Sequence, residues 1–245
     1  TNLKPGVSFL LGPILALFLV FAALGAIPVS DRWQISGLDS GVFFVFIAIV
    51  CARLMLFWTT YSVRSQWSPV AAIRMLAMMS QYLLPLLLAI IPPIVIAGGM
   101  DFTQILSSQG GWPWNWNIFH DPGAFLGGIT IFGALHLWQN RAPFDYAYAD
   151  TEIGGGLPAE SSGVVKGLVS LVDVMSFYLA CSLVTALYFG GGKTPFSLEY
   201  FGRGASLVQF FFFALKTVAL ALFSIWLRWS IPRLRIDQIT AYSWN

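Results

Sequence analysis

The sequence predicts an all-α protein, a bundle of about six membrane-spanning helices in a single domain over residues 1–245. Two observations support this fold class. The chain is 57% hydrophobic and only 10% charged, whereas soluble domains carry about 25% charged residues. Its apolar stretches are also long and unbroken. This favours helices over a β-barrel, because a membrane-spanning segment must satisfy its own backbone hydrogen bonds. A net charge of +2 is too small to indicate a nucleic-acid partner.

The predicted spans are apolar runs of roughly 20 residues, the length that crosses a bilayer. The first run ends at Ile27–Pro28, and the third begins at Ser68–Pro69. Proline is tolerated at a helix start because its missing N–H would have no partner there. No internal repeat is visible. In chain order, we expect spans at about 7–29, 41–61, 69–97, 123–139, 164–190 and 205–231.

Six spans place both termini on one side of the membrane, and basic residues indicate which side it is. Cytoplasmic and matrix segments carry an excess of Lys and Arg. The side with the termini would hold seven such residues and the other side three. We therefore expect an integral protein of a bacterial cytoplasmic or mitochondrial inner membrane, with its termini on the cytoplasmic or matrix side. The seven are Lys4, Arg64, Arg141, Lys166, Arg228, Arg233 and Arg235, and the three are Arg32, Lys193 and Arg203.

Residues 140–162 are predicted to form an acidic loop. It carries one base, Arg141, and four of the chain's eleven acids, which are Asp145, Asp150, Glu152 and Glu160. Clustered carboxylates repel one another, and such a cluster at a membrane surface can hold and pass protons. On charge alone, a solvated loop is the simpler interpretation. The apolar residues between the acids instead favour a loop that packs against a neighbour.

Asp173 lies about ten residues into the fifth predicted span, with no base within a helical turn. A charge at the bilayer centre costs about 2.5–3.5 kcal/mol on insertion scales, so such a residue by default indicates a proton or ion path. The alternative is a protonated carboxyl that is hydrogen-bonded to a neighbouring helix. Arg53 and Arg74 also lie in or near spans and could pair with acids. For Lys216, a role of this kind and snorkelling to the surface fit equally well.

The other candidate residues indicate no cofactor bound by this chain alone. Cys51 and Cys181 lie in apolar stretches and are interpreted as packing residues. His120 and His136 lie at opposite ends of one span, which does not fit a haem held between two helices. No nucleotide-binding or zinc-protease motif is present. An aromatic belt at the membrane interface is expected from Trp112, Trp114 and Trp116.

Three motifs occur in order along the chain. One is Tyr61-Ser62 followed by Arg74. Another is NRAPFD at residues 140–145, with Asp-x-Glu at 150–152 and Glu-Ser-Ser-Gly at 160–163. The last is IPRLRIDQ at residues 231–238, after a Phe-Ala-Leu-Lys-Thr run. Together they resemble subunit 1 of NADH dehydrogenase (the H subunit in bacteria), the quinone-site membrane subunit of respiratory complex I.

The resemblance implies a role for each matching residue. The proton path that couples quinone reduction to proton translocation would comprise Asp145, Asp150, Glu152, Glu160 and Asp173. The quinone chamber and its loop would be supported by Arg74, Arg141 and Phe144. The peripheral arm would be contacted by Arg233, Arg235 and Asp237. Ubiquinone or menaquinone would be the substrate at a shared site. Electrons would come from iron–sulfur clusters on other subunits, since this chain has no set of cysteine ligands.

The sequence also departs from the family pattern. Tyr148, Trp138 and Leu83 stand where the family has glutamate, and Gln81 and Arg53 are unusual additions near those positions. The family has eight spans, and the first and eighth have no counterpart here. We therefore expect either a split gene, with separate chains that supply these helices, or a chain trimmed at both ends.

The sequence thus predicts a membrane subunit of a proton-translocating NADH:quinone oxidoreductase, without a redox centre of its own. Its expected partners are the quinone-site subunits of the peripheral arm, the small membrane subunits, quinone and the lipid bilayer, with no nucleic acid. The membrane anchor of a NiFe hydrogenase-type complex is the alternative within the same wider family. A secondary transporter would show inverted repeats. A membrane scaffold would use the loop acids only to bind a neighbour.

Overall fold

The computed structural model describes residues 7–30, 37–63, 68–140, 144, 161, 163–196 and 204–231. Within these ranges every regular element is a helix, which confirms the predicted fold class. Three elements are short: α4 (Phe102–Ser108), the 3-10 helix η1 (Pro113–Asn115) and α5 (Asn117–His120). The long helices are α1 (Val7–Ala26), α2 (Gly41–Ser62), α3 (Ser68–Ala97), α6 (Pro122–Gln139), α9 (Gly163–Tyr188) and α10 (Ala205–Ser230).

Each of the six predicted spans coincides with one long helix, and the ends differ by a few residues. Among the described residues, five helices are long and apolar enough to cross a bilayer: α1, α2, α3, α9 and α10. The remaining helix, α6, has 18 residues and is not among the five. Its glycines and its polar last turn lower its hydropathy. That last turn is buried within the bundle, with His136 and Gln139 8% and 5% exposed.

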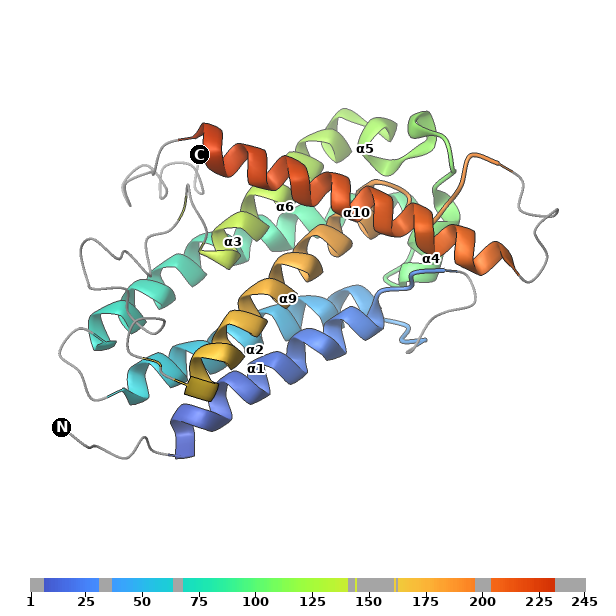
Figure 1. Cartoon of the computed structure of the whole chain (residues 1–245). Coiled ribbons are helices and arrows are strands. Elements are labelled where there is room, and N and C mark those ends of the chain that lie inside the picture. The colour runs from blue at the N-terminus through green and yellow to red at the C-terminus, as the bar shows by residue number, and fades with distance from the viewer. Residues whose placement is uncertain are drawn as a thin grey trace.

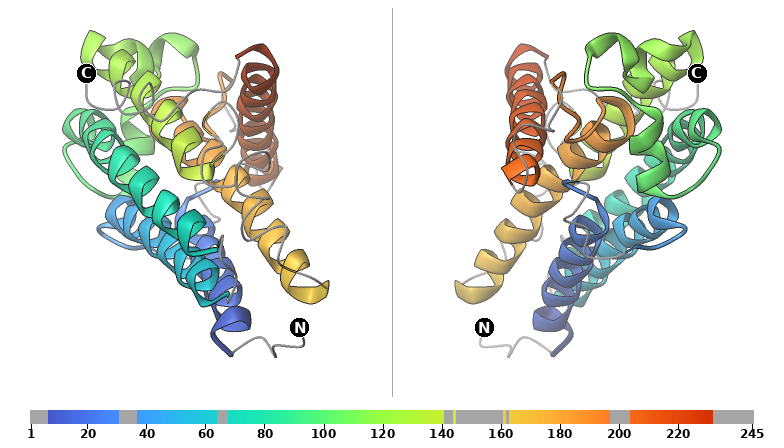
Figure 2. Two further views of the ribbon diagram at one scale, coloured as in Figure 1. Left: turned by 90° about the vertical axis from the view of Figure 1, so that its left-hand side faces the viewer. Right: turned by 90° about the vertical axis from the view of Figure 1, so that its right-hand side faces the viewer.

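The long helices pack side by side: α1 lies along α2 and α9, and α10 lies against α9 (Figures 1 and 2). Helix α1 packs along α2 through Gly12. A Cβ atom at this position would lie 3.0 Å from the carbonyl oxygen of Met55 and would collide with the Thr59 side chain. Glycine is therefore required for the close approach of these two backbones.

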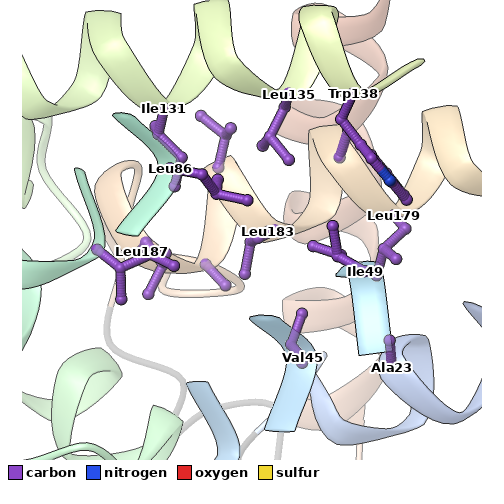
Figure 3. Close-up of a cluster of buried hydrophobic side chains, with 14 of the residues drawn as sticks. Ala23, Val45, Ile49, Leu86, Ile131, Leu135, Trp138, Leu179, Leu183 and Leu187 are labelled. Carbon is purple, nitrogen blue, oxygen red and sulfur yellow. The ribbon is translucent and has the colours of Figure 1, made fainter. Parts of the chain in front are cut away.

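The main core is an apolar cluster to which α1, α2, α3, α4, α6 and α9 contribute, together with Phe213 of α10 (Figure 3). Trp138 extends from the end of α6 toward Ile49 of α2 and Leu179 of α9 in the same view. Large apolar side chains also point outward, as Phe211 and Trp229 of α10 do at 63% and 85% exposure. An apolar exterior of this kind suits lipid or a neighbouring membrane subunit.

Helix α3 contains three internal prolines, Pro85, Pro92 and Pro93. Because proline has no N–H, Pro93 cannot donate to the carbonyl of Ala89 one turn earlier. The buried hydroxyl of Tyr188, at the end of α9, donates to this carbonyl at 2.5 Å. Gly127 of α6 makes room for the contact, since a Cβ atom there would lie 2.5 Å from the same hydroxyl. The proline break in α3 thus contributes to the contact with α9.

The C-terminal end of α9 is capped by side chains from three other elements. The Gln109 amide nitrogen, just after α4, donates to the carbonyls of Ala186 and Leu187 at 3.2 and 3.1 Å. Its amide oxygen accepts from the Gly190 N–H at 2.7 Å. The Asn117 amide of α5 also donates to Leu187, at 2.9 Å. These bonds satisfy carbonyls that have no partner within the helix itself.

Lys216 of α10 completes the cap. Its ammonium group donates to the carbonyls of Phe189, Gly191 and Lys193 at 2.9, 3.0 and 3.2 Å. It also lies 5.0 Å from the centre of the Trp116 ring. A cation is favourable at the negative end of a helix dipole. Lys216 therefore neither pairs with an acid in this contact nor snorkels: it binds backbone oxygens.

Candidate functional site

Asp173 is half-buried on α9, ten residues after the helix begins at Gly163. At 1.5 Å per residue, this places it about 15 Å along the helix, close to the middle of a bilayer core about 30 Å thick. The preceding residue, Val172, is 1% exposed and packs in a second core cluster. The described structure therefore has an acid at the depth of the membrane where an ionisable group is most costly.

Arg74 lies on α3, six residues after the helix begins at Ser68, and is half-buried. Its neighbour Met75 is 1% exposed and belongs to the same second core cluster as Val172. This cluster joins residues of α1, α2, α3 and α9. The turns that carry Arg74 and Asp173 therefore border one buried region.

Both ends of the predicted acidic loop are buried. Phe144 is 8% exposed and belongs to the main core cluster, and Ser161 is 4% exposed. The loop residues Arg141, Asp145, Asp150, Glu152 and Glu160 lie outside the described residues, as do the predicted peripheral-arm contacts Arg233, Arg235 and Asp237.

An apolar cavity of about 450 Å³ lies between α6, α9 and α10. Phe144 lines it, and so does His136, whose Nδ1 lies 2.8 Å from the Phe132 carbonyl oxygen. The rest of the lining is apolar side chains and glycine, including Val184, Leu220 and Phe223. The cavity can therefore accept an apolar chain, with one imidazole on its wall.

Arg53 of α2 is the most unusual charged group of the described bundle. It is 4% exposed, twelve residues after the start of α2 at Gly41. Its guanidinium carbon lies 5.8 Å from the centre of the Trp138 ring, and the group is close enough to the Tyr82 hydroxyl to act on it electrostatically. Its Nε and Nη1 atoms have no hydrogen-bond partner among the described residues.

The energetics of this arrangement are unbalanced. Removing an ion from water costs several kcal/mol even after the protein relaxes. A desolvated cation–π contact such as that with Trp138 recovers about 2 kcal/mol. The partial negative charge at the C-terminal end of α6, where Trp138 lies, adds about 0.3–1 kcal/mol. A strong anionic partner would remove the remaining deficit.

The histidines and cysteines do not gather around a metal in the described part of the chain. No group of three or more His, Cys, Asp or Glu residues able to hold a metal occurs there. His120, the last residue of α5, is exposed and lies 3.0 Å from Asp121, whereas His136 is buried near the C-terminal end of α6. Cys51 is half-buried and Cys181 is buried, and the two do not form a disulfide with each other.

Apolar helices of spanning length around a mid-span carboxylate define this chain as an integral membrane protein of the polytopic α-helical class. Residues 4–245 match the family model described as NADH dehydrogenase. The chain belongs to this family, that of complex I subunit 1 (the bacterial H subunit), which confirms the resemblance carried by the three sequence motifs.

Individual relatives agree with the family match. The chain is 29% identical over 241 residues to the H subunit of NADH-quinone oxidoreductase from Anaeromyxobacter dehalogenans, with 93% of this chain and 58% of the relative covered. It is 29% identical to the same subunit of Desulfotalea psychrophila, covering 97% of this chain and 71% of the relative. The chain thus spans somewhat more than half the length of the first relative and about seven tenths of the second.

A solved structure shares the fold. A chain of the membrane-bound sulfane sulfur reductase, an archaeal respiratory membrane complex, superposes with a TM-score of 0.85 at 25% identity. The match covers 100% of this chain and 77% of that one. The fold described here therefore occurs in respiratory membrane complexes beyond those named for NADH and quinone.

Sequence reasoning selected Asp173, Arg74 and Phe144 as candidate site residues, which stay predictions, and it singled out Arg53 and Trp138 as departures from the family pattern. It did not bring Arg53 and Trp138 together, because they lie 85 positions apart on helices α2 and α6. It also missed the capping residues Gln109 and Asn117, which look like ordinary loop residues in the sequence. Their only signal is an amide side chain next to a short apolar run.

Proposed function

We propose that this chain is the membrane subunit of a proton-translocating NADH:quinone oxidoreductase. In this role it forms part of the quinone chamber and carries part of the path that couples quinone reduction to proton movement. The family match over residues 4–245 is the observation that carries the proposal. The chain has no redox centre of its own in this account. Electrons reach the quinone from partner subunits, so the activity belongs to the assembled complex.

Asp173 is the residue to which we assign the inward step. Quinone reduction consumes protons, and the acids of residues 140–162 respond by changing their protonation. Asp173 passes this change toward the bilayer interior. Its half-buried position, about 15 Å along α9, supports the assignment, because a carboxylate there interacts strongly with any nearby change in charge. Arg74 on α3 borders the same buried cluster and supports the geometry of the path.

The quinone is assigned to a site shared with other subunits, with ubiquinone or menaquinone as substrate. The apolar cavity that reaches Phe144 supports this assignment, since its lining suits an isoprenoid tail. Arg141 would hold the start of the acidic loop beside the chamber, and Arg233, Arg235 and Asp237 would contact the peripheral arm. In this orientation both ends of the chain face the cytoplasm or the matrix.

The test of the coupling role is Asp173→Asn in the assembled complex, with Asp173→Glu as the conservative variant. We expect the Asn variant to lose at least about tenfold in NADH:quinone turnover and proton pumping, because a neutral amide cannot exchange a proton. The Glu variant should keep most of both. Asp39→Asn, at an exposed position before α2, is the matched control. Unchanged turnover and pumping in Asp173→Asn would remove Asp173 from the path.

A second candidate function is the membrane anchor of a related respiratory complex, such as a NiFe hydrogenase-type assembly. The observation in its favour is the fold shared with a chain of the membrane-bound sulfane sulfur reductase. The two candidates differ in their partner subunits. A flavoprotein that oxidises NADH would accompany the first, and a NiFe subunit the second.

A further inference from the structure

Arg53 lies in an enclosed part of the bundle, out of reach of most described acids. Asp39, Asp101 and Asp121 all lie at the end of the bundle where α2 begins, before or between the helices. Arg53 is twelve residues along α2 from that end, or about 18 Å. The apolar core cluster encloses the site, with Ile49 one turn before Arg53 on the same helix. Its positive charge is therefore not matched by any of these three carboxylates. Asp173 of α9, the fourth described acid, accepts no hydrogen bond from Nε or Nη1 of Arg53.

Two side chains from other helices lie beside this charge: the Trp138 ring of α6, whose centre is 5.8 Å from the guanidinium carbon, and Tyr82 of α3. Nε and Nη1 of Arg53 on α2 and the Trp138 indole N–H of α6 lack a hydrogen-bond partner among the described residues. The Tyr82 hydroxyl of α3 lies against the guanidinium and donates to no described acceptor. Tyr82 and Trp138 are each 1% exposed. Buried donors are almost always paired in native proteins. A set of donors around a lone cation is suited to an anionic acceptor.

We propose that Arg53, Trp138 and Tyr82 form an internal site for a small anionic acceptor, of the carboxylate or halide class, between α2, α3 and α6. The acceptor is either a free ion that enters the bundle or a carboxylate supplied within the assembled complex. Both offer the same chemistry, a compact negative charge that accepts two or more hydrogen bonds. This site is separate from the coupling role of Asp173 and stands without it.

Ordered water is the main competing occupant. The same helices bury amide oxygens of Gln81 and Gln139 that have no partner among the described residues, and water would satisfy them. Water does not neutralise the guanidinium charge, however. A hydrated site without an anion would therefore show no preference among anions. A neutral side chain in place of Arg53 would then leave the half-life of the complex unchanged or make it longer.

The test uses the purified complex at constant ionic strength, with bromide or formate compared against the bulky anion gluconate. The half-life of the complex at elevated temperature is measured for the wild type, Arg53→Met and Arg53→Lys. Arg228→Met, which removes an exposed arginine of α10, is the matched control. For a free ion at ten times its dissociation constant, we expect the wild-type half-life to rise about tenfold, with no rise in Arg53→Met.

A carboxylate from within the complex gives a different supporting result. The wild type then shows no dependence on the free anion, while Arg53→Met shortens the half-life much more than Arg228→Met does and Arg53→Lys restores most of it. Equal half-lives for Arg53→Met and Arg228→Met, with no anion dependence in the wild type, would overturn the proposal.

A measurement on the wild type alone covers the case in which the Arg53 variants do not assemble. Anomalous diffraction from the complex in bromide should place a peak within hydrogen-bond distance of Arg53 when the ion is free. When the acceptor belongs to the complex, the map should instead show a carboxylate at that distance. A map with neither bromide nor a carboxylate beside Arg53 would contradict the site.

Discussion

The Tyr188 hydroxyl donates a hydrogen bond to the Ala89 carbonyl. This carbonyl is available because Pro93 has no N–H to donate to it within α3. Replacing Tyr188 by Phe removes the donor and leaves a buried carbonyl without a partner. An unsatisfied buried acceptor costs about 1–3 kcal/mol. The hydroxyl is fully enclosed and its oxygen lies 2.5 Å from that of Ala89, so we expect about 2 kcal/mol. The free energy that holds the end of α9 against α3 should fall by this amount.

Pro93→Ala tests whether the missing N–H of Pro93 is the reason that Tyr188 is needed. Alanine at this position can donate its N–H to Ala89 within α3, so the Tyr188 hydroxyl is no longer the only donor. In the Pro93→Ala background, Tyr188→Phe should therefore cost less than about 1 kcal/mol. The double-mutant cycle should give a coupling energy of about 1–2 kcal/mol between positions 93 and 188. The coupling does not require contact between the two side chains, because both act on the Ala89 carbonyl.

The assay is the reactivity of Cys181, a buried thiol two turns before Tyr188 on α9. In a Cys51→Ser background, its rate of labelling by a small maleimide reports local opening of the helix. A cost of 2 kcal/mol corresponds to a rate about 30 times higher for Tyr188→Phe. Tyr178→Phe, at a more exposed position of the same helix, is the control. Equal costs of Tyr188→Phe with and without Pro93 would refute the reasoning.

Two further predictions concern the cap at the C-terminal end of α9. Lys216→Met keeps most of the side-chain length but removes a cation that is bound by three carbonyls. We expect a loss of about 2–3 kcal/mol in stability, measured as faster Cys181 labelling. The control is Lys166→Met, at an exposed site of α9. Gln109→Leu leaves the Gly190 N–H and the Ala186 carbonyl without their partner. It should lower the free energy of unfolding by about 2–4 kcal/mol, measured as the thermal stability of the complex. Gln104→Leu, on the exposed side of α4, should cost little. No difference between either variant and its control would show that the cap does not stabilise α9.

The long helices could be predicted from the sequence because their signal is simple. A run of 20 or more apolar residues crosses a membrane whatever its neighbours are, and α1, α2, α3, α9 and α10 all carry such runs. Helix α6 was predicted within two residues of its observed ends. Its polar last turn, with His136 and Gln139, shows why composition alone does not count it as a span.

The short elements and the polar contacts could not be predicted in the same way. Helices α4 and α5 have seven and four residues, too few for a periodic pattern, and they form because their side chains pack on the end of α9. The partners of Lys216 are backbone carbonyls, which the sequence does not display. Asp173 was recognisable because a lone acid in an apolar run is rare, but its neighbours depend on how α3 and α9 pack.

The assignment to an NADH:quinone oxidoreductase is tested most directly by mass spectrometry of the intact complex, purified through this chain in mild detergent. The account predicts a flavoprotein, iron–sulfur subunits and quinone-site subunits of the peripheral arm among the partners. A complex with a NiFe subunit and no flavoprotein, or a chain that purifies without partners, would contradict it.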